Sequence, residues 1–200
     1  SPQPLLVTTL RRVHFVELER FLVQHRLLAD AGELPCRHVG EIRVVAQRFR
    51  IWDYSQSNLA GWAAAGAQHR AVHVPVGWAP VLSRIEKRRD QDIDVLFYGS
   101  PSAARLSILT ELSNRGATCL FVCGMYGAER DELIARAKVV LNVNKHQAKI
   151  FEIVRVSYLM ANAKAVVADS PPGLFVEPDI AAAIAFRRIE EVPAQCERLL

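Results

Sequence analysis

Apolar runs of strand length recur between residues 93 and 170, and each ends in a turn of small or polar residues. The segments between these runs carry apolar side chains at helical spacing. Strands that alternate with helices are typical of a parallel sheet with helices packed against it, so the pattern predicts an α/β fold. The expected strands cover residues 93–98, 118–123, 138–143 and 165–168.

The expected helices have recognisable ends. Ser102 is a typical N-cap residue, and Gly116 suits the left-handed turn that closes many helices. Acidic residues gather in the first turn of the helix that starts at Glu129, where they complement the helix dipole. The expected helices cover residues 103–114, 129–137, 150–161 and 192–200.

The chain before residue 85 is less regular and is expected to form a smaller α/β segment. Short strands are expected at residues 51–54 and 71–76, on either side of a helix at residues 58–65. The charged stretch 84–91 is interpreted as a connector between domains. The chain is therefore expected to divide into two domains, residues 1–84 and residues 85–200.

Composition excludes several classes of protein. Half of the residues are apolar and 23% are charged, as in an ordinary globular protein. No apolar run approaches the ~18 residues that a membrane span needs, and the start shows no signal peptide. The four cysteines form no CxxC pair, which favours buried thiols in a reduced protein. A cytoplasmic location is therefore expected, and peripheral contact with the inner face of a membrane stays open.

The net charge of +4 is unevenly distributed along the chain. Residues 1–90 hold 13 Lys and Arg against 8 Asp and Glu, a balance of +5, and residues 91–200 hold 12 against 13, a balance of −1. A basic first part could face an anionic partner such as phosphate or a lipid surface, or it could be a solvated face. There is no long basic run and no basic-aromatic repeat, so no nucleic-acid partner is expected.

Two glycine turns follow the first two expected strands of the second domain. The turn at Gly99 and Ser100 could bring backbone N–H groups close to a phosphate, or it could be an ordinary turn between a strand and a helix. Gly124 and Gly127 flank Tyr126, whose ring could stack on a base or a sugar, or could simply lie at the surface. Neither turn is a GxGxxG fingerprint or a Walker loop.

Polar side chains are concentrated after the third expected strand. Asn142, Asn144 and Lys145 offer amide and amine groups that suit contacts with hydroxyls and phosphates. His146 adds an imidazole to the same loop. A lone histidine is more often structural or exposed than catalytic, so both interpretations stay open for His146.

Glu152 and Arg155 lie three residues apart and therefore share a helix face. The two oxygens of a carboxylate can bridge vicinal ribose hydroxyls, and a guanidinium can bind a diphosphate bidentately. The same two residues could instead form an ion pair within the helix. No H-E-x-x-H, H-x-x-E-H or Asp-x-Asp pattern supports a metal site, and no G-x-S-x-G motif supports a serine hydrolase.

Several short segments are informative because of the order in which they occur. They are IWDYS (51–55), NL (58–59), HVPVG (73–77), IDVLFYGS (93–100), YGAERD (126–131), AKVVLN (137–142) and IFEIVRVSY (150–158). In this order they resemble the C-terminal half of bacterial GT-B glycosyltransferases and the segment just before it. The closest resemblance is to the group-1-like enzymes that assemble polysaccharides and surface glycans, and it covers roughly residues 51–180.

The resemblance implies a Rossmann-like parallel sheet that holds a nucleotide-diphosphate sugar, usually without a metal or another cofactor. Glu152 would then bind the ribose, and the turn at Gly99 and Ser100 would lie near the diphosphate or the acceptor cleft. The candidate catalytic residues are His146 and Arg155. The candidate nucleotide-binding residues are Gly99, Ser100, Gly124, Tyr126, Gly127, Asn144, Lys145, Lys149 and Glu152.

The resemblance implies the transfer of a sugar to a glycan, lipid or protein acceptor. The first domain would then be a partial acceptor domain. Tyr158 stands where many retaining members carry the second of two glutamates, so the stereochemical course stays open. A non-catalytic nucleotide-binding or scaffold module derived from a GT-B half is one alternative. An unrelated flavodoxin-like or regulatory α/β domain is another, and its mark would be an acidic cluster at the strand ends.

Overall fold

The structure is a computed structural model, and it describes residues 8–9, 50–64, 66–144, 151–170 and 172–200. The chain splits into two compact units. The larger unit spans residues 77–200 and includes the short strand β1 (Thr8–Thr9). The smaller unit lies within residues 14–76.

In the described part of the chain, the larger unit contains a six-stranded sheet with the order β1-β5-β4-β6-β7-β8. Strand β1 pairs antiparallel with β5, and all the other pairings are parallel. The expected α/β fold with a parallel sheet is therefore confirmed. The parallel strands are β4 (Ile93–Tyr98), β5 (Cys119–Val122), β6 (Ala137–Asn142), β7 (Ala165–Asp169) and β8 (Ala185–Arg187).

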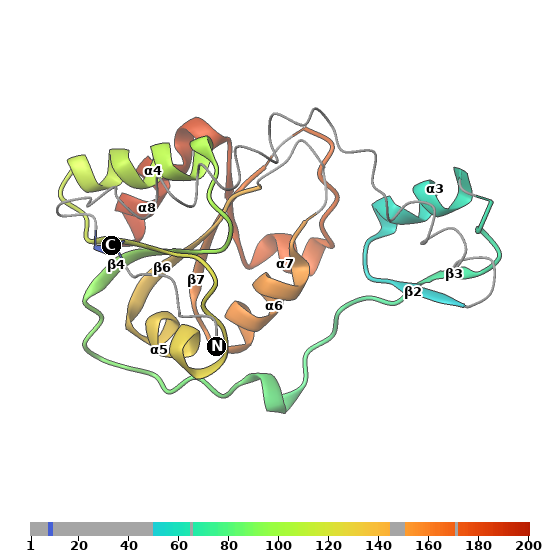
Figure 1. The fold of residues 1–200 in the computed structure, drawn as a ribbon, viewed down its shortest axis with the longest axis horizontal. Coiled ribbons are helices and arrows are strands. Elements are labelled where there is room, and N and C mark those ends of the chain that lie inside the picture. Colours follow the sequence, from blue (N-terminus) through green and yellow to red (C-terminus); the bar gives the residue numbers. More distant parts are fainter. Residues whose placement is uncertain (1–7, 10–49, 65, 145–150, 171) are drawn as a thin grey trace. The chain divides into compact units, whose positions relative to one another are not determined.

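Helices cover both faces of this sheet (Figure 1). Helices α4 (Ala103–Asn114) and α8 (Val192–Leu199) pack on one face, and helices α5 (Gly127–Arg136) and α6 (Ile153–Ala161) pack on the other. The short helix α7 (Pro178–Ala182) precedes β8. Because α6 begins at Ile153, Glu152 is the N-cap residue of this helix.

Helix α4 has the ends that its sequence predicts. The Ser102 hydroxyl oxygen accepts a hydrogen bond from the backbone N–H of Arg105 at 3.4 Å. After the helix, Gly116 adopts a φ of 100°, a left-handed conformation that glycine tolerates far better than other residues. These two residues fix the limits of α4, and with them the place of Arg105 in its first turn.

One part of the hydrophobic core lies between the sheet and helices α4 and α8. Phe97 of β4 is fully buried, and its ring stacks on that of Phe121 with 5.6 Å between the ring centres and 6° between the planes. Cys119 and Cys196 lie in the same cluster, and burial raises the pKa of both thiols to about 12. These cysteines therefore behave as small apolar residues, as expected.

The chain segment before β4 belongs to the larger compact unit, and the domain boundary predicted between residues 84 and 85 stays a prediction. The larger unit begins at Gly77. The reason lies in Asn162, a buried residue after α6, whose Oδ1 accepts the backbone N–H groups of Arg84 and Ile85 at 3.0 and 2.8 Å. The Ser83 hydroxyl also donates to the carbonyl of Ala161 at 2.8 Å. None of the helices in the described ranges combines the length and the apolar character of a membrane span.

The order of the parallel strands reverses direction at one place in the sheet, between β4 and β6. Counted over the parallel strands alone the order is 2-1-3-4-5, so the chain leaves β4 toward one side and leaves β6 toward the other. In open α/β sheets, ligands bind outside the carboxyl ends of the strands at such a reversal. We call this place the switch point, and it lies between the ends of β4 and β6, next to Gly99 and Val143.

The smaller unit contains a two-stranded parallel sheet among its described residues. Strand β2 (Ile51–Asp53) pairs with β3 (Ala71–His73), and helix α3 (Gln56–Ala64) lies between them in sequence. Asp53 accepts hydrogen bonds from the Ser55 backbone N–H, the Asn58 amide and the Trp62 indole, at 2.9, 3.1 and 2.7 Å. Burial alone would raise the pKa of Asp53, but these hydrogen bonds hold it below its usual value.

Replacement of Asp53 by alanine is expected to destabilise the smaller unit by about 1–3 kcal/mol, because three donors lose a charged acceptor. Equilibrium urea unfolding followed by tryptophan fluorescence measures this loss, since Trp62 is one of the donors. Asp53→Asn keeps one carbonyl oxygen and should lose less. The control is Gln68→Ala, which changes an exposed side chain of the same unit. Equal stability of Asp53→Ala and the wild type would contradict this role.

Candidate functional site

A buried arginine, Arg105, lies at the switch point. It projects from the first turn of α4, and its side chain is only 3% exposed. Its Nε and Nη2 donate to the carbonyl oxygen of Val143 at 2.7 and 2.5 Å, and its Nη1 donates to the carbonyl oxygen of Ser100 at 2.7 Å. Burial lowers the pKa of Arg105 and nearby Glu152 opposes this, but an arginine remains a cation in proteins. One guanidinium thus joins the loop after β4 to the loop after β6.

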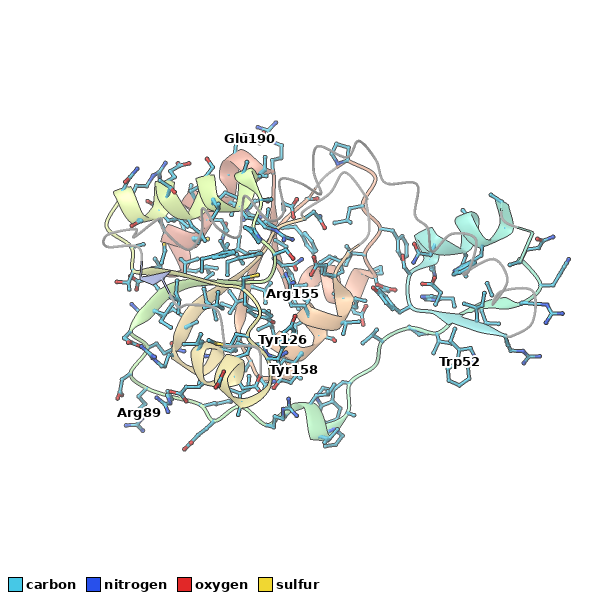
Figure 2. All side chains as sticks on the ribbon, in the orientation of Figure 1. Trp52, Arg89, Tyr126, Arg155, Tyr158 and Glu190 are labelled. Atoms are coloured by element: carbon cyan, nitrogen blue, oxygen red, sulfur yellow. The ribbon has the colours of Figure 1, made fainter. Side chains whose placement is uncertain are left out.

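Arg155, in the first turn of α6, brings a second guanidinium to the same place (Figure 2). Its Nη1 donates to Oδ1 of Asn142, a buried residue at the end of β6, at 3.5 Å. Its guanidinium carbon lies 5.1 Å from the ring centre of Tyr98 and 5.8 Å from that of Phe97. Such cation–π contacts hold a guanidinium in place while its N–H groups remain available to other partners.

Glu152 is the acidic member of this group. Its Oε2 lies 2.8 Å from Nη2 of Arg155, and its Oε1 lies 3.5 Å from Nη2 of Arg105. The Glu152 side chain is 36% exposed, and it makes no capping hydrogen bond to α6. The ion pair that the sequence left open is therefore present. Arg105, Glu152 and Arg155 together form what we call the arginine–glutamate cluster, with two cations and one anion.

Gly99 leaves room for this cluster. Its φ of 139° lies in the region that favours glycine, and a Cβ added there would lie 3.1 Å from Nη2 of Arg155. A side chain at this position would therefore strain the backbone and press on the guanidinium. Ser100 follows, and its carbonyl is bonded to Arg105. The structure thus places Gly99, Ser100 and Glu152, which were predicted to bind the nucleotide, around the same two arginines.

Asn144 lies just after β6 and is held by the next strand. Its backbone N–H and its side-chain amide both donate to Oδ1 of Asp169, at 2.8 and 3.2 Å. Asp169 is the last residue of β7 and is buried, and this burial raises the pKa of its carboxyl group. The amide nitrogen of Asn144 is therefore engaged inside the protein in this structure.

The turn from Gly124 to Gly127 follows β5 and leads into α5. The φ angles of Gly124 and Gly127 are 74° and 63°, and an added Cβ would meet no atom within 4 Å at either position. The two glycines thus serve the backbone conformation rather than a close approach. Tyr126, the N-cap residue of α5, is 77% exposed, so its ring is open to a ligand (Figure 2).

A second network lies beside the cluster, against α5. The Tyr158 hydroxyl donates to Oδ2 of Asp131 at 2.8 Å and accepts from Nε of Arg84 at 2.9 Å. The guanidinium carbon of Arg130 lies 5.0 Å from the ring centre of Tyr158 and 5.9 Å from that of Tyr98. The Tyr98 ring also contacts the guanidinium of Arg155. Burial raises the pKa of the Tyr98 phenol to about 12. Alternating arginines and aromatic rings therefore connect this network to the cluster.

A groove of about 470 Å³ lies beside the second network, between residues 84–88 and helix α5. Its two arginines are already paired, Arg84 with Asp131 at 3.3 Å and Arg88 with Glu132 at 2.9 Å. The arginine–glutamate cluster, in contrast, carries one more cation than anion. An anionic ligand is therefore better matched to the cluster than to the groove.

The predicted residues that the structure describes fall into two groups in space. Four of them meet at the cluster, and Asn144 lies beside it. The glycine turn with Tyr126 follows β5, which borders β4 on the side away from the switch point. Lys145, His146 and Lys149 lie outside the described residues. The four that meet at the cluster are Gly99, Ser100, Glu152 and Arg155.

Arg105 was not predicted from the sequence, although a signal for it exists. The buried positions of α4 are 105, 108, 109 and 112, which follow the spacing i, i+3, i+4 and i+7 of one helix stripe. An arginine therefore occupies a core position among apolar residues. A buried arginine needs partners for its N–H groups, so this placement points to a functional or anchoring role.

The cluster is suited to an anion that also carries hydroxyl groups. Guanidinium groups bind phosphate oxygens, and a carboxylate accepts hydrogen bonds from hydroxyls.

Among the described residues, no group of three or more His, Cys, Asp or Glu side chains could hold a metal ion.

Comparison with known proteins finds a distant relative of viral origin. No family model matches the chain. The chain is similar to uncharacterized protein L140 of Acanthamoeba polyphaga mimivirus, with 26% identity over 126 residues. The match covers 60% of this chain and 40% of the viral protein, so the chain spans less than half the length of that relative.

Proposed function

We propose that the chain binds a nucleotide-diphosphate sugar at the switch point and takes part in transferring the sugar to a glycan, lipid or protein acceptor, as GT-B glycosyltransferases do. The observation that carries the proposal is the convergence of Arg105, Glu152 and Arg155 outside the ends of β4 and β6. Two guanidiniums suit a diphosphate and a carboxylate suits a ribose diol. The sequence resemblance to the donor half of these enzymes points the same way.

In such a transfer an acceptor hydroxyl oxygen bonds to the anomeric carbon and gives up its proton to a base, while the bond between that carbon and the diphosphate breaks and negative charge develops on the leaving diphosphate. Arg155 would stabilise that charge, because its guanidinium is held in place by the Tyr98 ring before the reaction begins. Arg105 would keep the two strand-end loops together through its carbonyl hydrogen bonds, and its Nη2, which faces Glu152 at 3.5 Å, would turn to the phosphates. Lys145, His146 and Lys149, which lie outside the described residues, are proposed to contact the sugar or the phosphates.

The strand order also occurs in flavodoxin-like domains, which makes such a domain the second candidate. The feature expected there was an acidic cluster at the strand ends. The described strand ends instead bring together two arginines and one glutamate, while Asp169 is buried against Asn144. This charge balance speaks against a domain with an acidic cluster at its strand ends and favours an anionic ligand, which the first proposal supplies. A nucleotide-binding module without catalysis fits the same geometry. It differs from a glycosyltransferase in that it would bind the sugar donor without turning it over.

The proposal is tested first by a thermal-shift screen of UDP, GDP, ADP and CDP. A ligand present at 100 times its Kd raises the free energy of unfolding by about 2.7 kcal/mol, so a true ligand gives a clear rise in Tm. Arg155→Ala should weaken binding of the best diphosphate by about tenfold to a hundredfold, because the phosphates lose a charge-assisted partner. Arg115→Ala, which removes an exposed arginine paired with Glu197, should leave binding unchanged.

The screen contradicts the proposal if none of the four diphosphates stabilises the wild type, or if Arg155→Ala binds as tightly as Arg115→Ala. Turnover then separates the two remaining candidates. A glycosyltransferase is expected to release the nucleoside diphosphate slowly from its donor in water, and Arg155→Ala should reduce that rate. Tight binding with no release of diphosphate supports the non-catalytic module.

A further inference from the structure

We infer that the Glu152 carboxylate changes partners when a diphosphate binds. The phosphates would take the guanidiniums of Arg105 and Arg155, and the released carboxylate would accept the hydroxyls of the ribose. The inference rests on the proposed function, since it concerns the same site. It makes Glu152 a determinant of specificity, because the site would prefer ligands that join a phosphate chain to a ribose over ligands with either part alone.

The two arginines are held by groups other than Glu152. Arg105 makes three hydrogen bonds to backbone carbonyls at 2.5–2.7 Å, whereas its contact with Glu152 is long, at 3.5 Å. Its guanidinium also lies 4.7 Å from the ring centre of Phe97. Arg155 is supported by the Tyr98 ring and by the side chain of Asn142. Both guanidiniums can therefore stay in place when the carboxylate leaves.

Glu152, in contrast, is the member that can move. Its side chain is the most exposed of the cluster, at 36% against 17% for Arg155 and 3% for Arg105. Within the described residues, its carboxylate contacts these two arginines and does not cap α6. Its release would thus leave the helix start and the strand-end loops as they are.

The charges decide the direction of the exchange. A diphosphate carries more negative charge and more acceptor oxygens than a carboxylate, so it can engage both arginines at once with shorter, charge-assisted hydrogen bonds. The displaced carboxylate would then lie near an anion without a cationic partner. Hydroxyl groups can donate hydrogen bonds to the carboxylate in place of the lost guanidinium contacts, and a ribose diol supplies two such groups. Binding of the phosphates and binding of the ribose should therefore favour each other.

The test uses isothermal titration of the full chain with inorganic pyrophosphate and with uridine, guanosine, adenosine and cytidine. Glu152→Gln has nearly the same shape as the wild type and removes the carboxylate that competes for the arginines. It is expected to bind pyrophosphate about threefold to tenfold more tightly than the wild type. Saturating pyrophosphate should raise the affinity of the wild type for the nucleoside at least about fivefold. In Glu152→Gln, pyrophosphate should no longer raise the nucleoside affinity.

The matched control is Glu111→Gln, which removes a carboxylate from an exposed pair with Arg115 and changes the net charge by the same amount. It should bind pyrophosphate within about twofold of the wild type. Equal tightening in both glutamine variants would reduce the effect to net charge and overturn the exchange. Unchanged or weaker pyrophosphate binding by Glu152→Gln overturns it as well, even where a nucleoside diphosphate stabilises the wild type. If no diphosphate binds the wild type, the proposed function itself fails.

Discussion

Replacing Arg105 with alanine should lower the free energy of unfolding of the larger unit by about 3–5 kcal/mol. The variant loses three hydrogen bonds and leaves the carbonyl oxygens of Ser100 and Val143 without their donor. It also opens a cavity beside the Phe97 ring, which the guanidinium covers at 4.7 Å. Equilibrium urea unfolding at constant m-value measures the loss through the shift of the midpoint.

Arg105→Lys and Arg198→Ala complete this experiment. A lysine keeps the positive charge but cannot span two carbonyls with a planar group, so an intermediate loss of about 1–2 kcal/mol is expected. Arg198→Ala changes an exposed arginine of α8 and should stay within about 0.5 kcal/mol of the wild type. A stability of Arg105→Ala close to that of the Arg198 control would show that the arginine does not hold the two loops together.

Phe97→Ala should lower the free energy of unfolding by about 3–5 kcal/mol, the usual range for a fully buried phenylalanine. The ring stacks on Phe121 inside the core, and its other contacts include the guanidiniums of Arg105 and Arg155. The variant therefore loses core packing and the surface on which the cluster rests. Urea unfolding gives the loss of stability, and a loss below about 1 kcal/mol would contradict the assignment of Phe97 to the core.

Two milder variants separate the packing role of Phe97 from its contact with the cluster. Phe97→Leu and Phe121→Leu each remove one ring of the same stack and keep an apolar side chain. Both should lose a similar amount of stability, about 1–2 kcal/mol. Phe97→Leu alone should also weaken binding of the best nucleoside diphosphate, because its ring supports both arginines. Equal binding by the two variants would remove that support from the proposal.

The parallel strands and the helices between them could be predicted from the sequence because each carries a strong local signal. The run from Ile93 to Tyr98 is almost continuously buried, and α4 is bounded by Ser102 and Gly116. The pairing of β6 with β4 has no such signal, because β5 lies between them in sequence. Spatial order depends on contacts between distant segments, which the pattern of one segment does not contain.

For the candidate site too, the local placement of residues could be predicted but their convergence in space could not. Glu152 and Arg155 could be assigned to one helix face from their spacing, and Gly99 and Ser100 to a strand end from the turn. Their meeting with Arg105 depends on the packing of α4 and α6 on opposite faces of the sheet, so no local spacing contains it. The hydrogen bond from the Arg84 backbone N–H to Asn162 joins residues 78 positions apart, so no local pattern contains it either.

The hydrogen bonds of Arg105 make the cluster dependent on contacts between distant parts of the chain. The partner of Arg105 at Val143 lies 38 residues away in sequence, just after β6, and β6 pairs directly with β4 although β5 lies between the two strands in sequence. Closing a loop of that kind is a late and entropically unfavourable step compared with forming a single helix. The cluster therefore cannot exist on α4 or α6 alone. It forms together with the sheet, so the charge balance at the switch point is a property of the assembled unit and of no single element.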